Sequence, residues 1–284
     1  MNDLVHIESS DLAELAEILG TKVSGNNEAS NTIVRVPELK INSRSRDKLT
    51  KKPIPEGYFY LTNMEKTVYA ETVTFRPLAS HIQYFHWDDV DGERKLVCKS
   101  RAVKTTREEA RDTRGGIACG MPDWDRRKEL PREEQAKWRA MQMRVTRGLV
   151  SLTGETADGE EVTYENIPCI MFHKNSNYSG FWKQFMKKVP KGRHIHEYQA
   201  VLSSEYQENG SVVWYTFNYD IDLSSTLPLT KEVFDTMKVF AETIQAENKY
   251  VDQKYFEALK EGALDDSAIE ALGDTLDDDF EDVA

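Results

Sequence analysis

The chain has 284 residues and a net charge of −12, and 39% of its residues are hydrophobic. This composition predicts a soluble globular protein of one or two domains, and no run of about 18 apolar residues indicates a membrane span. Three scattered cysteines are too few for a disulfide framework and no secretory signal is recognisable, so we expect a cytoplasmic protein without membrane contacts.

Residues 1–32 predict a short helical arm followed by a linker. Leu12, Leu15 and Leu19 recur at helical spacing, and Gly20 ends the pattern. Residues 24–32 are polar and have no periodicity, which is typical of a linker. The arm is therefore expected to be separate from the folded body.

Residues 33–229 have the alternating pattern of antiparallel strands. The strand-like segments include residues 68–77, 80–87, 144–152, 167–172 and 197–221, and turn sequences lie at 88–92, 154–159 and 207–210. Several short strands at this spacing predict a barrel or a sandwich. A basic insertion at about 99–143 interrupts the pattern, with a polar helix from about Arg132 to Met143. An insertion of this length is usually functional or disordered.

A long C-terminal helix is predicted over residues 230–262, followed by an acidic tail at 263–284 that we expect to be disordered. Val233, Met237 and Phe240 give the helix an apolar face, and the Thr230 hydroxyl can cap it. The tail contains nine Asp and Glu residues and no Lys or Arg. Such a composition cannot form a packed core.

Because the tail is strongly acidic, the net charge of the whole chain does not show that other stretches are basic. Without its nine carboxylates the net charge of −12 becomes −3, and residues 94–147 hold sixteen Lys and Arg against eight Asp and Glu. Phosphate backbones require basic partners, so the net charge of the whole chain does not exclude a nucleic-acid ligand.

No motif for catalysis is present, neither a P-loop, a dinucleotide fingerprint, a nucleophile elbow nor a zinc-protease helix. We therefore predict that the chain is not an enzyme and has no catalytic residue, cofactor or bound metal. Asp88, Asp89 and Asp91 resemble a metal-binding loop, but hairpin turns use aspartate routinely and the turn is favoured.

Two residue sets keep metal binding open as an alternative. His194 and His196 would lie on one face of a strand, where two imidazoles can chelate a metal. A tetrahedral zinc site could be completed by Cys98, Cys119, Cys169 and His173. Both sets also fit ordinary structural roles, an exposed strand for the histidines and core positions for the cysteines.

Cations and aromatic residues alternate in several separate segments, which is the combination that a sequence-tolerant single-strand binder needs. The residues predicted to neutralise phosphates are Arg76, Lys99, Arg101, Lys104, Arg144, Arg147, Lys174 and Lys183. The residues predicted to stack on bases are Phe75, Tyr84, Phe85, Trp87, Phe172, Tyr178 and Trp182. The alternative is that the aromatic residues form the core and the cations a solvated face.

The acidic tail can act on such a site in two ways. It can compete with nucleic acid for the cations, and it can dock onto basic pockets of partner proteins. The tail residues predicted to contact partners are Asp277, Asp278, Asp279, Phe280, Glu281 and Asp282. A purely solubilising tail is the alternative.

The tail sequence DTLDDDFEDVA at residues 274–284 resembles the tails of phage and bacterial single-stranded DNA-binding proteins. The segments YAETVTFRP (69–77), CKS (98–100), GGIACG (115–120) and IPC (167–169) are similar to those of a group of phage proteins of this size. The family's tails commonly end in an aromatic residue, whereas Phe280 is internal here.

The resemblance implies a mainly β (α+β) fold, an OB-like antiparallel β-barrel with a basic insertion and a long C-terminal helix. It also implies coating of single-stranded DNA without sequence specificity, during phage DNA replication or recombination in the host cytoplasm. Replication and recombination proteins would bind the tail, and a homo-oligomer is a further expectation. Two other functions remain open, a phage structural or protein-interaction protein and a metal-dependent enzyme.

Overall fold

The structure is a computed structural model that describes residues 36–47, 50–210 and 212–260. The predicted arm at 1–32 and the acidic tail at 263–284 lie outside the described residues. The described chain divides into two compact units, the first made of residues 36–79 with 146–237, and the second of residues 80–145 with 238–260.

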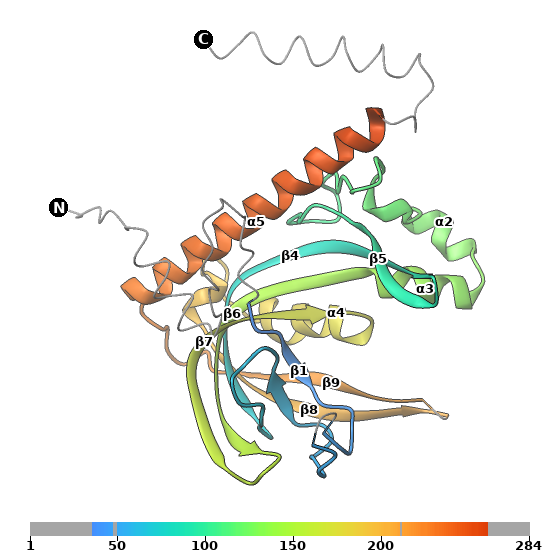
Figure 1. The fold of residues 1–284 in the computed structure, drawn as a ribbon. Coiled ribbons are helices and arrows are strands. Elements are labelled where there is room, and N and C mark those ends of the chain that lie inside the picture. The colour runs from blue at the N-terminus through green and yellow to red at the C-terminus, as the bar shows by residue number, and fades with distance from the viewer. Residues whose placement is uncertain (1–35, 48–49, 211, 261–284) are drawn as a thin grey trace, which may run out of the picture. The chain divides into compact units, whose positions relative to one another are not determined.

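The first unit contains most of the strands. Its elements are β1 (Leu39–Ile41), β2 (Phe59–Leu61), β3 (Val68–Tyr69), β7 (Glu161–His173), α4 (Ser176–Phe181), the π-helix η2 (Trp182–Met186), the 3-10 helix η3 (Ile195–Glu197), β8 (Ala200–Asn209) and β9 (Val212–Ile221). Figure 1 shows β8 and β9 as a long hairpin and β6 with β7 as a curved pair.

The second unit contains the insertion. Its elements are β5 (Glu93–Lys99), the 3-10 turn η1 (Ala118–Gly120), α2 (Trp124–Glu129) and α3 (Arg132–Met141). Three elements contribute residues to both units, namely β4 (Val73–Val90), β6 (Gln142–Thr156) and α5 (Lys231–Ala258). The polar helix predicted from Arg132 is therefore confirmed as α3, and the predicted C-terminal helix is confirmed as α5.

The main sheet has seven strands. Its order is β3-β6-β4-β8-β9, with β5 also paired to β4 and β7 to β6, and β1 pairs with β2 in a separate two-stranded sheet. Of the described residues 41% are in strands, most of them in a large antiparallel sheet, which confirms the mainly β class. No pairing among the described strands closes the sheet into a barrel.

Each unit has its own apolar cluster. In the first unit Phe59, Phe75, Met171, Phe181 and Leu202 are buried between the strands and α4. The second unit has a smaller cluster whose buried members are Ile82, Tyr84, Cys98, Val103, Ala110, Cys119 and Met141. Part of the insertion is therefore packed around a core rather than wholly exposed.

The strand β4 runs through Pro77, where the sequence pattern predicted two separate strands. Residues Val73–Phe75 pair with β8 and residues Phe85–Val90 pair with β5, so Pro77 lies between the two paired stretches. A proline has no N–H to donate, and Pro77 lies outside the stretches that pair with β8 and β5. The turn predicted at 88–92 is confirmed, because Asp91 and Gly92 both have positive φ, as a two-residue type I′ hairpin requires.

Gly148 permits a close approach of β6 to β4. A Cβ at this position would lie 2.3 Å from the Arg76 carbonyl oxygen and 2.7 Å from the Phe75 ring. Gly154 has the same role, since its Cβ would lie 2.2 Å from the Tyr69 carbonyl oxygen. Any side chain at either glycine would push the strands apart.

The segment that contains His194 and His196 was predicted as a strand, and this prediction is wrong. Residues Ile195–Glu197 form the 3-10 turn η3, and the two imidazole rings stack with their centroids 5.3 Å apart. Burial and the neighbouring His194 charge lower the pKa of His196. Among the described residues, no helix is both long and apolar enough to cross a membrane.

Candidate nucleic-acid interface

Residues 174–193 form a continuous segment, here called the lysine-rich segment, that contains no Asp or Glu. Its six cations are Lys174, Lys183, Lys187, Lys188, Lys191 and Arg193. All six side chains are exposed, and the segment comprises α4, η2 and the turn that follows. Of these cations only Arg193 forms an ion pair within the described chain, at 3.7 Å from Glu197.

Aromatic stacking fixes the inner face of α4 and η2. The Phe181 ring stacks on His173 at 5.1 Å and on Phe185 at 5.4 Å, and Tyr219 packs edge-on against Phe181. Phe181, Phe185 and His173 have no exposed surface, and burial raises the pKa of Tyr219. Because this face is buried, the opposite face of α4 and η2 is turned to solvent. Trp182 is 48% exposed, and the exposed Lys183 follows it in sequence.

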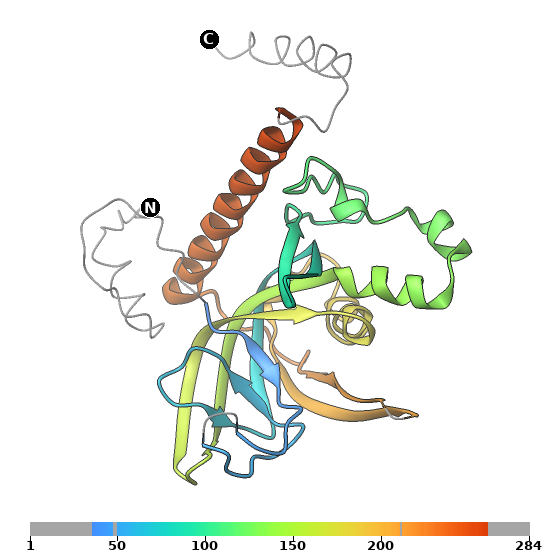
Figure 2. The same ribbon diagram turned by 45° about the vertical axis from the view of Figure 1, so that its right-hand side comes forward.

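Two side chains of this segment also bind the edge of β9, the last strand in the sheet order. Asn177 Oδ1 accepts a 2.9 Å hydrogen bond from the Phe217 N–H, and Gln184 Oε1 accepts a 2.8 Å bond from the Tyr219 N–H. The two amides therefore replace the carbonyl groups of a further strand. Figure 2 shows α4 nearly end-on in this part of the fold.

The π-helix η2 widens the backbone between Trp182 and Met186. The Lys187 N–H donates to the Trp182 carbonyl at 2.9 Å, a bond that spans five residues. Single π turns are uncommon and are found frequently at functional sites. The segment thus combines a buried aromatic face that holds it on the sheet, an exposed indole and several exposed cations. Base stacking together with phosphate neutralisation requires this combination.

Four of the predicted DNA-binding residues, Lys174, Tyr178, Trp182 and Lys183, come together on this segment. Tyr178 is half-buried and the two lysines are exposed. Phe172 lies just before the segment, on β7, and is half-buried. Lysines 187, 188 and 191 follow in the same segment and are also exposed.

Five of the other predicted residues are buried in β4 and β6. Phe75, Tyr84 and Phe85 are at most 7% exposed, and Arg144 and Arg147 are 8% and 2% exposed. Both strands are paired to neighbours on either side within the sheet, and the low exposure of these five side chains shows that other residues cover them. In this structure these five side chains lie in the core and do not present a surface to nucleic acid.

Two of the insertion's predicted cations, Lys99 and Arg101, form ion pairs with α5. Lys99 Nζ lies 3.1 Å from Glu247 Oε2, and Arg101 Nη1 lies 3.4 Å from Asp252 Oδ1. The backbone of Ala102 adds a 2.7 Å hydrogen bond to Asn248 Oδ1. These charges thus attach the insertion to the part of α5 in the second unit.

Arg76 has a structural role in the first unit. Its Nε donates to the His196 carbonyl at 2.7 Å and its Nη2 to the Pro228 carbonyl at 2.8 Å, and burial lowers its pKa. The remaining predicted residues, Trp87 and Lys104, are exposed and belong to the second unit. The structure therefore divides the predicted set rather than gathering it.

The sequence did not indicate which α5 side chains bind Lys99, Arg101 and the backbone of Ala102 in the insertion. The α5 residues Glu247, Asn248 and Asp252 are close in sequence, but nothing in their spacing indicates which basic stretch they contact. It also missed Asn177 and Gln184, because an amide that binds a strand edge has no sequence pattern of its own.

The four residues predicted to bind zinc together belong to two different units. Cys169 and His173 lie in the aromatic core of the first unit, whereas Cys98 and Cys119 belong to the second unit. There the two thiols lie beside Asp112, and the three ligand atoms are within 4.8 Å of one another. The hydrogen bond to Cys98 and burial raise the pKa of the Cys119 thiol.

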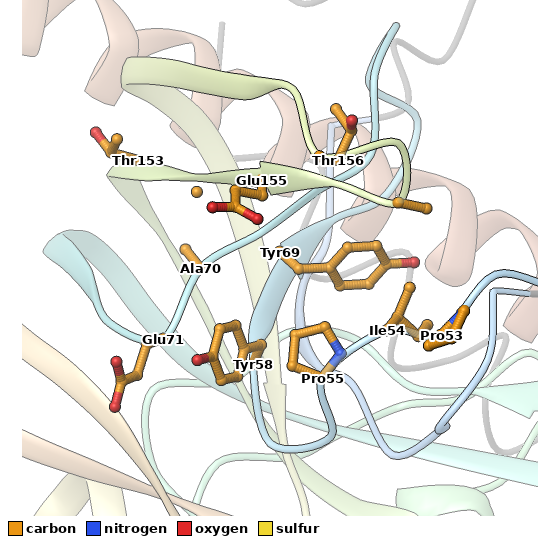
Figure 3. Close-up of a pocket in the computed structure, with 13 residues that line it drawn as sticks. Pro53, Ile54, Pro55, Tyr58, Tyr69, Ala70, Glu71, Thr153, Glu155 and Thr156 are labelled. Carbon is orange, nitrogen blue, oxygen red and sulfur yellow. The ribbon is translucent and has the colours of Figure 1, made fainter.

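An open hollow of about 480 Å³ lies in the first unit between β3, β6 and the loop before β2. Figure 3 shows Tyr58, Pro55 and Tyr69 along one side, with Glu71 and Glu155 as its charged residues. No Lys or Arg lines it. Two carboxylates without a cation disfavour phosphate, so this hollow is not the candidate interface.

No family model, curated protein or solved structure matches the chain. The functional argument therefore depends on the residues and their geometry.

Proposed function

We propose that the chain binds single-stranded DNA without sequence specificity, through the lysine-rich segment. The observation that carries the proposal is the exposed indole of Trp182 among lysines that have no carboxylate partner in the described structure. Phosphates would contact Lys174, Lys183, Lys187 and Lys188, and bases would stack on Trp182. No catalytic step is part of this function.

The wider role is coating of single strands during phage DNA replication or recombination. The acidic tail would compete with DNA for the lysines and recruit replication or recombination proteins. An OB-like fold and a homo-oligomer belong to the same proposal, and the antiparallel β architecture supports the first of these. Single-strand binding by OB-like sheets commonly combines a cationic path with aromatic platforms.

The test is a titration of a fluorescent oligothymidine with the full chain at two salt concentrations. Each phosphate contact to a single strand contributes about 0.7 to the slope of log affinity against log salt. Replacing Lys183, Lys187 and Lys188 by Gln should therefore reduce the slope by about 2 and weaken binding. The matched control replaces Lys40, Lys52 and Lys66, which are paired with Glu38, Asp158 and Glu160.

The control variant should bind as the unmodified chain does. Absence of binding at low salt, or equal losses in the two triple variants, would contradict the proposal. Competition with oligouridine and with duplex DNA in the same assay identifies the preferred nucleic acid.

A protein-interaction role is the second candidate, and the end of the β8–β9 hairpin favours it. Tyr206, Val212 and Val213 are 53%, 61% and 47% exposed, which is unusual for apolar residues so close together. A partner protein would bury them, and this binding would depend little on salt. The salt titration therefore separates the two candidates.

A further inference from the structure

The second unit contains a compact group of metal-ligand side chains that the proposed function does not use. Cys98 ends β5, Cys119 lies in η1 and Asp112 lies in the loop between them. The three residues are 2%, 7% and 1% exposed. Their ligand atoms are mutually within 4.8 Å. We propose that Cys98, Cys119 and Asp112 bind a zinc ion, with His86 as the fourth ligand.

The spacing suits tetrahedral zinc. Zinc–sulfur and zinc–oxygen bonds of about 2.3 and 2.0 Å place tetrahedral ligand atoms roughly 3.5–3.8 Å apart. The group therefore has to contract by about 1 Å at most to reach this geometry. Two thiolates and one carboxylate are a donor set that prefers zinc to magnesium or calcium, which bind oxygen ligands.

The Asp112 carboxylate is buried without a cationic partner among the described residues. Its Oδ1 accepts backbone N–H groups of Arg114 at 2.9 Å and Gly116 at 3.1 Å, and its Oδ2 accepts the Cys119 N–H at 2.8 Å. A carboxylate has about four lone-pair positions, so Oδ2 retains one for a metal. A bound cation would neutralise the buried charge and occupy that position.

The backbone around Cys119 is held in an uncommon conformation. Ala118 and Cys119 have φ values of 52° and 55°, in the left-handed region that is unfavourable for a non-glycine residue. The turn directs the Cys119 N–H to Asp112 and its thiol to the cluster. A zinc ion would supply free energy that offsets this cost, whereas core packing alone needs no such turn.

The strand register indicates the fourth ligand. The ring nitrogens of His86 are not among the ligand atoms within 4.8 Å of one another, so its imidazole would have to turn toward the thiols when the ion binds. His86 is the direct partner of Cys98 across β4 and β5, so the two side chains share a face of the hairpin with Cβ atoms about 5 Å apart. The Cys119 thiol donates a 3.7 Å hydrogen bond to the carbonyl of Tyr84, two residues before His86 on β4. His86 is half-buried, and its imidazole supplies a neutral nitrogen ligand beside two thiolates.

The binding reaction is balanced by proton release. Each cysteine loses its thiol proton to solvent as its sulfur binds Zn²⁺, Asp112 binds as the carboxylate and His86 as the neutral imidazole. Nothing is oxidised or reduced. Zinc would thereby join β4, β5 and the loop 110–121 in the second unit.

The first experiment measures metal in the full chain, purified with a thiol reductant, by elemental analysis. About one zinc per chain is expected. Cobalt added to the metal-depleted chain should give a thiolate-to-cobalt charge-transfer band and visible bands of a tetrahedral site. Absence of both zinc and the cobalt bands, or a disulfide between Cys98 and Cys119 under reducing conditions, would overturn the proposal.

Variants assign the ligands. Cys98→Ser and Cys119→Ser should each lose most of the charge-transfer intensity, and Asp112→Asn and His86→Ala should shift the visible bands. Cys169→Ser is the matched control, since Cys169 is equally buried but lies in the first unit. Loss of the bands in Cys169→Ser, or their retention in Cys98→Ser, would contradict the assignment. The unmodified chain's cobalt spectrum remains a test even where a variant fails to fold.

Discussion

Lys99 Nζ lies 3.1 Å from Glu247 Oε2 and 5.9 Å from the centre of the Phe85 ring. The lysine is thus part of the packing between the insertion and α5, with both charged side chains about three-quarters buried. Lys183 is its counterpart, since it is exposed and has no ion pair within the described residues. The two lysines should therefore respond oppositely to replacement.

Lys99→Ala should lower the free energy of unfolding by about 1 kcal/mol and leave DNA affinity within about twofold. Lys183→Ala should leave stability within about 0.5 kcal/mol and weaken DNA binding. Urea unfolding and the oligothymidine titration measure the two quantities. A larger loss of affinity in Lys99→Ala than in Lys183→Ala would show that the insertion, not the lysine-rich segment, binds DNA.

Trp182→Ala should weaken oligothymidine binding by about 1–3 kcal/mol, which is about 5- to 150-fold, because each stacked base contributes that amount. Trp87→Ala is the control, since Trp87 is 43% exposed but lies in the second unit. Affinity measured for both variants at one salt concentration checks this. Equal losses would mean that exposure alone, and not the lysine-rich surroundings, determines which indole binds.

Asn177→Ala should destabilise the fold by about 1 kcal/mol, because the Phe217 N–H loses its 2.9 Å acceptor. Asn177→Asp keeps the Oδ1 acceptor and should recover most of that loss. Ser179→Ala, an exposed change in the same helix, serves as the control. Urea unfolding measures all three, and equal stability of the Ala and Asp variants would rule out an effect of the hydrogen bond.

Gly148→Ala should destabilise the fold by about 3 kcal/mol, because its Cβ would meet the Arg76 carbonyl at 2.3 Å. Gly180→Ala in α4 is the matched change, with no atom within 4 Å of the new Cβ. It should alter stability by at most about 1 kcal/mol, in the stabilising direction. Thermal unfolding of the two variants compares a blocked and an open position.

Replacing Asp277, Asp278 and Asp279 by Asn should tighten DNA binding at low salt if the tail competes for the lysines. The gain should shrink as salt rises, because screening weakens the competing contact as well. The oligothymidine titration at both salt concentrations measures it. Equal affinities at low salt would leave the tail with a partner-docking or solubilising role.

The sequence predicted strands within β4, β6, β7, β8 and β9, the hairpin turn at Asp91–Gly92 and the helices α3 and α5, since periodicity and turn residues are local signals. It did not distinguish Phe75 from Trp182. Both are aromatic residues next to a cation in sequence, yet Phe75 lies in an inner strand and Trp182 on a helix at the sheet edge. That difference is set by strand order, which local patterns do not contain.

The same limit applies to charge. Lys99 and Lys183 are equivalent in sequence, and only the position of Glu247 in the folded chain separates them. The sequence likewise did not show that Asp112 lies beside Cys98 and Cys119. This proximity depends on a left-handed turn at Ala118–Cys119, which cannot be predicted from non-glycine residues.

The two amides on the edge of β9 limit how copies of this chain could join one another in the proposed coating of a DNA strand. At Phe217 and Tyr219 the backbone donors are already occupied, so a second chain cannot extend the sheet there by adding its own strand. Neighbouring molecules would have to meet elsewhere, so this part of the β9 edge does not offer the site for strand-by-strand aggregation that an open edge provides.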